Sequence, residues 1–400
     1  MDSSEARGLL LKGLKGKTNL RPDQPHFWHG RLLCEESLSP PKVSWQSTQK
    51  PRDDHDAPDW LTASEYIDLD RVMEMKIERL ADLLRASKKT VVYSGAGISR
   101  AAGIGQAARG GGRGGNKSTT AQPTFTHYAL SALAKMGLIH GWVQQNHDGL
   151  PQKAGFPQEC INEVHGSWYD PSNPVVLYSG CLREHECEWM EQEANTADLS
   201  VVLGTSLGGL NADQVAITPA ERSLRGHTLG MVLINLQQTE HDGKSTLRVF
   251  GSSDTVFELL LTKLNAAPMP PMQPAVFTGA RKVLVPYDEN GNRSKTVKTW
   301  LDLSPGASIR LNPNHNIQGA KQPIYLHIGA KRSHRYRGEL RAKGPGHGVV
   351  KRWSKRTVGI DLEIEGVHML LGQWWVEAAQ RGGPRSIPVV NLEPVKVIAP

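Results

Sequence analysis

Apolar positions in the first two thirds of the chain alternate between the period of a helix and the continuous run of a buried strand. Over residues 67–86, apolar side chains recur every three or four positions, which predicts an amphipathic helix. Short apolar runs follow, with stretches of helical period between them. Strands are expected at 90–93, 142–145, 199–204 and 231–235, and further helices at 126–136 and 189–195. This alternation predicts an α/β fold with a doubly wound parallel sheet and helices on both faces.

The pattern changes after residue 265. Residues 266–272 read Ala-Ala-Pro-Met-Pro-Pro-Met, which is the composition of a linker. Short runs rich in Val, Ile, Leu and Tyr follow, separated by turn residues, and predict a smaller, mostly antiparallel β domain. The strands expected there are 282–287, 296–301, 307–311, 324–328, 358–364 and 368–371. Residues 1–60 show no sustained period, so an extended arm is expected there. The predicted division is an arm at 1–60, an α/β domain at 61–265, a linker at 266–280 and a basic β domain at 281–400.

Positive charge is concentrated in the C-terminal part. Residues 266–400 hold 20 Lys/Arg against 9 Asp/Glu, whereas the net charge of the whole chain is +7. Ten of these cations lie within residues 331–356, together with Tyr336 and Trp353. Cations beside stacking rings are typical of a nucleic-acid surface. A solvated charged hairpin or a contact to an acidic protein partner explains the same composition, so both interpretations stay open.

Several segment types are not indicated by the sequence. No run of about 20 apolar residues is present that would span a membrane. The first five residues, Met-Asp-Ser-Ser-Glu, include two acids and lack a basic region followed by a long apolar one, which argues against a secretory signal. The cysteines at 34, 160, 181 and 187 form no paired framework, which favours a reducing compartment. We expect an intracellular protein, nuclear or cytoplasmic, although the basic, leucine-containing residues 7–21 leave a mitochondrial presequence open.

The most specific signal is an apolar strand that runs into a Gly-Ala-Gly turn at residues 95–97, with Ser99 positioned to open a helix. Glycines let backbone N–H groups approach a pyrophosphate, and a helix N-terminus adds partial positive charge. Other polar segments stand beside apolar strands downstream. They are 145–150 (Gln-Asn-His-Asp-Gly-Leu), 165–166 (His-Gly), 204–206 (Gly-Thr-Ser) and Asn235.

In this order and spacing, the segments resemble the sirtuins, the NAD-consuming protein-lysine deacylases and ADP-ribosyltransferases, over roughly residues 60–265. The chain is most similar to the nuclear-type, class IV-like branch, because residues 234–239 read Ile-Asn-Leu-Gln-Gln-Thr and Asp242 follows. The resemblance implies a Rossmann-like sheet, NAD as cofactor and an acyl-lysine protein as substrate. From the residues alone, each turn also fits a structural role at a strand end.

The resemblance also implies roles for individual residues. His165 would be the general base that draws a proton from the nicotinamide-ribose hydroxyls while the acyl oxygen attacks C1′, a task suited to imidazole. Asn146 would hold the ribose, and Asp148 would accept a hydrogen bond from the nicotinamide carboxamide. The cofactor-binding positions carried over are Gly95, Ala96, Gly97, Ser99, Arg109, Gln145, Gly204, Thr205, Ser206 and Asn235.

Two departures from the family pattern support a second hypothesis. After Ile104 the family continues Pro-Asp-Phe-Arg, whereas this chain has a Gly-rich stretch in which only Arg109 has a counterpart. Only seven residues separate Gly166 from Pro174, so the zinc ribbon is missing and zinc is not expected. Cys181, His185 and Cys187 supply at most three ligands. The rival to a deacylase is therefore a catalytically impaired module with a basic docking domain.

Overall fold

The structure is a computed structural model that describes residues 3–34, 37–51, 57–104, 119–176, 182–208, 211–271, 281–312 and 346–398. The chain forms two compact units. Unit 1 comprises Met1–Asn116, Pro123–Gln145 and His185–Pro270, and unit 2 comprises Lys117–Gln122, Asn146–Glu184 and Pro271–Pro400. This division differs from the predicted one, because residues 146–184 group with the C-terminal part.

Unit 1 contains a parallel sheet, as predicted. Five neighbouring strands belong to this unit, in the order β4-β3-β6-β7-β8. All four pairings between these neighbours are parallel. The strands are β3 (Thr90–Ser94), β4 (Gly141–Gln144), β6 (Leu199–Leu203), β7 (Gly230–Ile234) and β8 (Leu247–Val249). Every residue in them is buried, as expected for strands covered on both faces.

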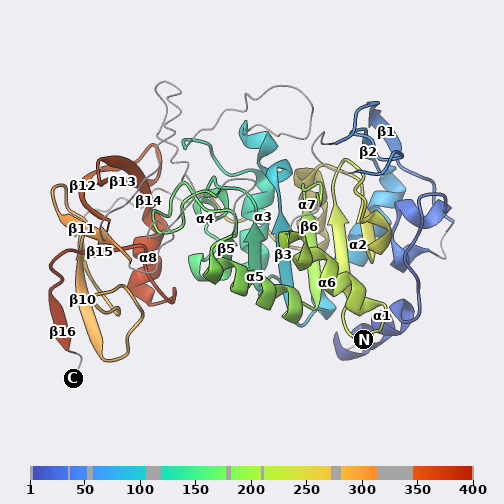
Figure 1. Ribbon diagram of the computed structural model, residues 1–400. Helices are drawn as coiled ribbons and strands as arrows, with labels where there is room; N and C mark the ends of the chain where they lie inside the picture. The colour runs from blue at the N-terminus through green and yellow to red at the C-terminus, as the bar shows by residue number, and fades with distance from the viewer. Residues whose placement is uncertain are drawn as a thin grey trace. The chain divides into compact units, whose positions relative to one another are not determined.

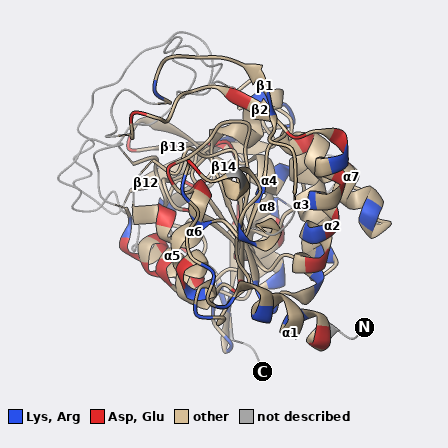
Figure 2. Cartoon of the chain, turned by 90° about the vertical axis from the view of Figure 1, so that its right-hand side faces the viewer, with Lys and Arg blue, Asp and Glu red and all other residues tan. Residues whose placement is uncertain are grey.

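Helices lie on both faces of this sheet (Figures 1 and 2). One face carries α2 (Asp70–Ala86), α3 (Phe125–Lys135) and α7 (Ser253–Leu264), and the other carries α5 (Glu184–Thr196) and α6 (Gln214–Ser223). The helices expected at 67–86, 126–136 and 189–195 are confirmed. The sequence analysis missed α6, which contains Pro219, and α7, whose apolar residues Val256, Phe257, Leu260 and Leu261 do recur at helical spacing.

The N-terminal residues are folded onto unit 1 instead of forming an extended arm. The elements are α1 (Ser3–Leu14), η1 (Pro25–Trp28), η2 (Arg31–Leu33), and an antiparallel pair of strands, β1 (Lys42–Trp45) and β2 (Glu65–Ile67). Arg7 forms an ion pair with Asp198, and the fully buried Arg31 donates to Ser223 Oγ at 2.7 Å. The apolar anchors Phe27 and Leu33 are too widely spaced to produce a period, so pattern analysis did not detect this packing.

Unit 2 contains the predicted antiparallel β domain, built from two sheets in the orders β14-β13-β12-β11-β15 and β16-β10-β9. Its elements are β9 (Lys282–Val285), β10 (Val297–Asp302), β11 (Ser308–Leu311), β12 (His347–Ser354), β13 (Gly359–Ile364), β14 (Val367–Gly372), α8 (Gln373–Arg381), β15 (Val389–Asn391) and β16 (Lys396–Ile398). A further apolar run at 324–328, read as a strand in the sequence, lies outside the described residues.

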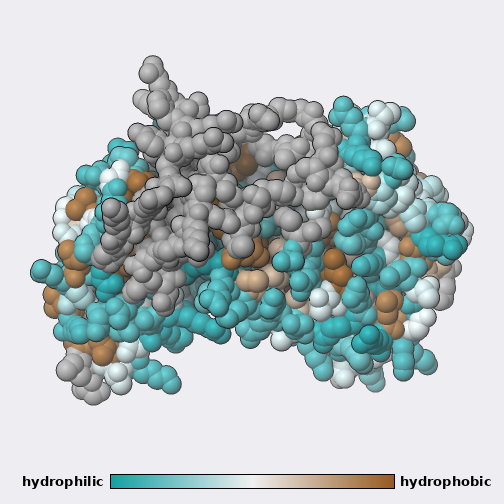
Figure 3. All heavy atoms as spheres, in the orientation of Figure 1, coloured by the Kyte–Doolittle hydropathy of each residue, from teal (hydrophilic) through white to brown (hydrophobic). Residues whose placement is uncertain are grey.

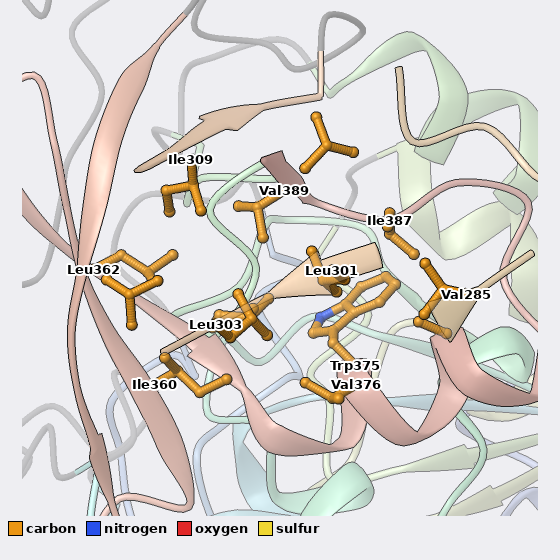
Figure 4. Close-up of a cluster of buried hydrophobic side chains, with 14 of the residues drawn as sticks. Val285, Leu301, Leu303, Ile309, Ile360, Leu362, Trp375, Val376, Ile387 and Val389 are labelled. Atoms are coloured by element: carbon orange, nitrogen blue, oxygen red, sulfur yellow. The ribbon is translucent and has the colours of Figure 1, made fainter. Parts of the chain in front are cut away.

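A hydrophobic core holds unit 2 together. Figure 4 shows side chains from the strands and from α8 directed toward one another. They include Val285, Leu301, Ile309, Ile360, Leu362, Trp375, Val376 and Val389, all at most 9% exposed. Burying a side chain of this kind stabilises a fold by about 1.5–3 kcal/mol. This core also includes Tyr169, whose hydroxyl bonds to the carbonyl of Thr357 at 3.0 Å, which explains why residues 146–184 group with this unit.

The remaining elements of unit 2 come from that inserted segment. They are α4 (Leu150–Lys153), η5 (Gln158–Cys160) and β5 (Ile161–Glu163).

On the face drawn in Figure 3, hydrophilic side chains predominate among the described residues, with hydrophobic ones scattered between them. Among the described helices, none combines the length and apolar character needed to cross a membrane.

Candidate active site

A cavity of about 480 Å³ lies in unit 1, where the parallel strands end. The turns that follow β3, β6, β7 and β8 line it. β3 and β6 are neighbours in the sheet, although the chain passes from β3 to β4 on the other side. Ligands bind at such a switch point of an open α/β sheet. Seven of the ten predicted cofactor residues line this cavity: Ala96, Gly97, Gln145, Gly204, Thr205, Ser206 and Asn235.

The other three predicted cofactor residues do not line the cavity in the described part of the chain. Gly95 supports the turn from behind, since its N–H donates to the Leu203 carbonyl at 3.0 Å. Ser99 is fully buried. Arg109 lies outside the described residues.

Sequence analysis missed several lining residues: Glu65, Arg100, Gln237 and residues 252–254. Residues 252–254 begin α7, where the side chain of the N-cap Ser252 accepts from the N–H of Thr255 at 3.2 Å. The Ser-Ser-Asp sequence two residues after β8 is a helix-start signal, so these three residues were detectable. Glu65 lies just before the helix predicted at 67–86 and belongs to no predicted element, so no pattern indicated it.

Gly97 and Gly204 are required for packing between two turns. The N–H of Gly97 donates to the Gly204 carbonyl at 2.8 Å. A Cβ on Gly97 would lie 2.5 Å from Gly204 Cα, and a Cβ on Gly204 would lie 2.7 Å from Gly97 Cα. Both contacts are to backbone, which has little freedom to move away. These glycines therefore bring the ends of β3 and β6 together and thereby form the floor of the cavity.

This packing changes what a substitution at Gly97 is expected to do. From the sequence, a valine there would abolish NAD binding by filling the space where phosphate meets backbone. The structure instead directs the side chain at Gly204, so Gly97→Val should lower the free energy of unfolding, by about 1–3 kcal/mol or more. Denaturant unfolding measures this loss. Unchanged stability together with lost NAD binding would restore the original explanation.

A chain of hydrogen bonds fixes the polar side chains at the cavity. Thr205 Oγ1 donates to Gln145 Oε1 at 3.1 Å, and Gln145 Nε2 donates to the Tyr93 hydroxyl at 2.5 Å. Tyr93 in turn donates to Asp213 at 2.8 Å. Burial and the neighbouring Asp213 raise the pKa of Tyr93, which therefore stays a donor. Asn235 Nδ2 donates to the Thr205 carbonyl at 3.1 Å, which ties the turns after β6 and β7 together.

Arg248 holds the segment after β7, which lines the cavity. Its guanidinium donates to the carbonyl oxygens of Asn235 at 3.1 Å and Gln237 at 2.6 Å, and its Nε is 3.0 Å from Asp242 Oδ2. Arg248 and Asp242 are both fully buried. Asp242 Oδ1 accepts from the N–H and the hydroxyl of Thr239. The family-like Asn-Leu-Gln-Gln-Thr segment is thus shaped by a buried ion pair.

The three predicted catalytic residues lie in unit 2, where two segments are bonded together. The His147 carbonyl accepts from the Trp168 N–H at 2.9 Å, and His147 Nδ1 lies 2.8 Å from the Gly166 carbonyl. These bonds bring the Asn146 and Asp148 segment beside His165. His147 therefore has a structural contact. Asp148 is 2% exposed and accepts from the Leu150 N–H at 3.0 Å.

Burial shifts the charge states around these residues. Burial, assisted by Asp170, raises the pKa of Glu163 to about 8. Burial lowers the pKa of Lys153 to about 8, although Asp148 opposes this shift. Lys153 Nζ donates to the Thr119 and Ala121 carbonyls at 2.8 and 3.2 Å. This region of unit 2 therefore holds ionisable groups away from water, as active sites do.

The candidate metal ligands do not form a site among the described residues. His185 and Cys187 stand on α5, and Cys187 Sγ lies 3.9 Å from Glu191 Oε1. Cys181 lies outside the described residues. Within the described ranges, no group of three or more His, Cys, Asp or Glu is placed to hold a metal ion.

No model of a protein family matches the chain. The NAD-dependent protein deacetylase SRT1 of Arabidopsis thaliana is 28% identical over 329 residues, covering 66% of this chain and 67% of that protein. The NAD-dependent protein deacetylase Sirt6 of Drosophila melanogaster is 29% identical over 255 residues, covering 49% and 77%. The NAD-dependent protein deacetylase sirtuin-7 of Homo sapiens is 27% identical over 242 residues, covering 48% and 60%.

Among solved structures, the similarity covers about half of this chain. A structure described as "Sir2-p53 peptide-NAD+" covers 47% of this chain and 98% of that chain, with 22% identity and a TM-score of 0.41. The relatives in sequence come from a plant, an insect and a mammal, and all three are named NAD-dependent protein deacetylases. Seven residues of the motifs that carry the resemblance line the cavity. The chain is therefore similar in sequence to sirtuin deacetylases over about half to two thirds of its length.

Proposed function

We propose that this protein cleaves the nicotinamide–ribose bond of NAD and transfers the ADP-ribose to the acyl group of a modified lysine. The observation that carries the proposal is the cavity of about 480 Å³ at the switch point, lined by seven residues predicted from the sequence to bind NAD. Its hydroxyls, amides and glycine turns are the donors that phosphates and ribose hydroxyls require. The catalytic part is proposed to span residues 61–265, and the protein to be nuclear or cytoplasmic.

In this proposal, NAD supplies the activated ribose carbon, and the chain's own residues bind it and move the proton. The turn residues Gly97, Thr205 and Ser206 bind the diphosphate and ribose, and Asn235 binds the adenosine side. Asn146 and Asp148 orient the nicotinamide end, and His165 accepts the ribose hydroxyl proton. The hydrogen bonds that link the His147 and Gly166 segments support a shared role for these three residues.

The test is calorimetric titration with NAD, followed by release of nicotinamide in the presence of an acetyl-lysine peptide. The proposal expects binding and peptide-dependent release. Binding without release would instead favour the catalytically impaired module. Absence of NAD binding would overturn the proposal and leave the impaired module as a structural or docking protein.

We further propose that the basic segment 331–356 docks on nucleic acid. Of its ten cations, four lie in the described part. Lys351 and Arg352 form ion pairs with Glu363 and Asp361, at 3.1 and 2.5 Å. Lys355 and Arg356 are exposed at the end of β12, and no ion pair is assigned to either in the described ranges. The unpaired cations support a polyanion contact, whereas the two ion pairs favour the alternative of a solvated hairpin.

Binding to RNA and to duplex DNA at two salt concentrations separates these alternatives. If five or six cations contact phosphate, the log–log salt slope should be about −4 to −5, at about −0.9 per contact. Replacing Lys355 and Arg356 with Ala should reduce its magnitude by roughly 2. Replacing the exposed Lys298 of β10 serves as the control. Negligible binding at low salt would indicate that the segment contacts an acidic protein partner or is a solvated charged hairpin.

A further inference from the structure

Arg100 contributes a guanidinium to the wall of the dinucleotide cavity. It lies in η3 (Ala96–Ala102), three residues after Gly97, and it lines the same cavity. Its Nη1 donates to Glu65 Oε1 at 3.3 Å. The side chain of Arg100 is 41% exposed, whereas that of Glu65 is 9% exposed. The pair therefore joins a buried carboxylate to a cation that reaches the open space.

The charged residues that line the cavity indicate what Arg100 can bind. Of the described residues that line it, two are acidic, Glu65 and Asp254, and Arg100 alone is basic. Asp254 Oδ1 is occupied by the N–H of Thr126 at 2.8 Å and by its hydroxyl. The diphosphate of a dinucleotide carries two negative charges, which these carboxylates would repel. A guanidinium has five N–H donors, so one bond to Glu65 leaves others for phosphate oxygens.

Glu65 is held rigidly where it can fix the orientation of Arg100. β2 runs antiparallel to β1, and the next residue, Tyr66, donates its N–H to the Leu236 carbonyl at 2.8 Å. In addition, Gln237 Nε2 donates to the Ala63 carbonyl at 2.9 Å. The N-terminal hairpin is thereby fastened to the cavity wall at residues 236–237. A carboxylate in a fixed position already orients the arginine side chain. Binding a ligand then costs less conformational entropy.

We propose that Arg100 is a direct ligand of the diphosphate and that Glu65 is its positioning residue. The inference rests on the proposed function, in which the ligand is NAD, and it adds a specific phosphate contact to that site. It also gives the N-terminal residues a role in recognition of the cofactor. ADP-ribose contains the diphosphate and adenosine does not, so this pair of probes isolates the contact.

The experiment measures calorimetric affinities of ADP-ribose and adenosine for the full chain and its variants. Arg100→Ala should weaken ADP-ribose by about 10- to 100-fold, as expected for a hydrogen bond to a charged group. It should leave adenosine within about twofold. Arg100→Lys should recover part of the loss, because it keeps the charge without the fork. The control is Arg79→Ala, which removes a 44% exposed arginine of α2 that is also paired with a carboxylate.

Glu65→Gln tests the positioning role. It should weaken ADP-ribose binding by a few-fold in the wild-type background, because Arg100 loses the carboxylate that orients it. When Arg100 is already Ala, Glu65→Gln should cause no further weakening, because the carboxylate then only repels the diphosphate. If wild type binds ADP-ribose and Arg100→Ala binds it equally well, the phosphate contact is wrong and the proposed function stands. An equal loss for adenosine would indicate a structural role and also overturn the inference. If wild type fails to bind ADP-ribose, the proposed function fails and the inference fails with it.

Discussion

His165→Ala is expected to lower the rate of nicotinamide release by about 10²- to 10⁴-fold, the usual cost of losing a general base. NAD affinity should stay within a few-fold, because the cavity in unit 1 is lined by residues other than His165. Single-turnover release of nicotinamide, with NAD and an acetyl-lysine peptide saturating, measures the effect. Affinity is measured separately by calorimetry.

The matched control for this variant is His368→Ala. His368 is an exposed histidine on β14, also in unit 2. Its replacement removes one imidazole, as His165→Ala does, but leaves the hydrogen bonds between the His147 and Gly166 segments in place. It should retain the wild-type rate. If wild type and His165→Ala release nicotinamide equally slowly, the protein is the impaired module that the missing Pro-Asp-Phe segment and zinc ribbon suggested.

The sheet of unit 1 was predictable because its strands are buried on both faces. Continuous apolar runs such as 199–204 stand out against polar turns, and β6 (Leu199–Leu203) matches that run to within one residue. β12 (His347–Ser354) was missed for the opposite reason. It buries Val350 and exposes Lys351 and Arg352, so it lacks both the alternation and the apolar run of a strand.

The same contrast applies to the site. Gly97, Thr205 and Asn235 each follow an apolar strand, so the sequence indicated that they lie at the edge of the sheet where the strands end. All three line the cavity at that edge. Glu65 and Arg100 meet through a hairpin whose position depends on contacts between segments far apart in the chain. No local pattern encodes such a contact. The roles of His165, Asn146 and Asp148 came from the family resemblance and stay predictions.

Arg248→Ala is expected to destabilise the protein by about 3–5 kcal/mol, because it leaves Asp242 as an uncompensated buried charge. It also removes the donor to the Asn235 and Gln237 carbonyls and the contact of the guanidinium with the Phe250 ring, 3.5 Å from its centroid. Denaturant unfolding measures the loss. Removing the exposed Arg79 instead should change stability by less than about 0.5 kcal/mol.

NAD binding provides the second measurement on Arg248→Ala. Arg248 is fully buried and does not line the cavity, so any loss of affinity in the folded variant arises from the wall that it holds. Combining Arg248→Ala with Asp242→Asn should recover part of the lost stability, since the buried charge is then removed. A variant within about 1 kcal/mol of wild type would show that water replaces the guanidinium. The ion pair would then not be what shapes the nucleotide-binding segment.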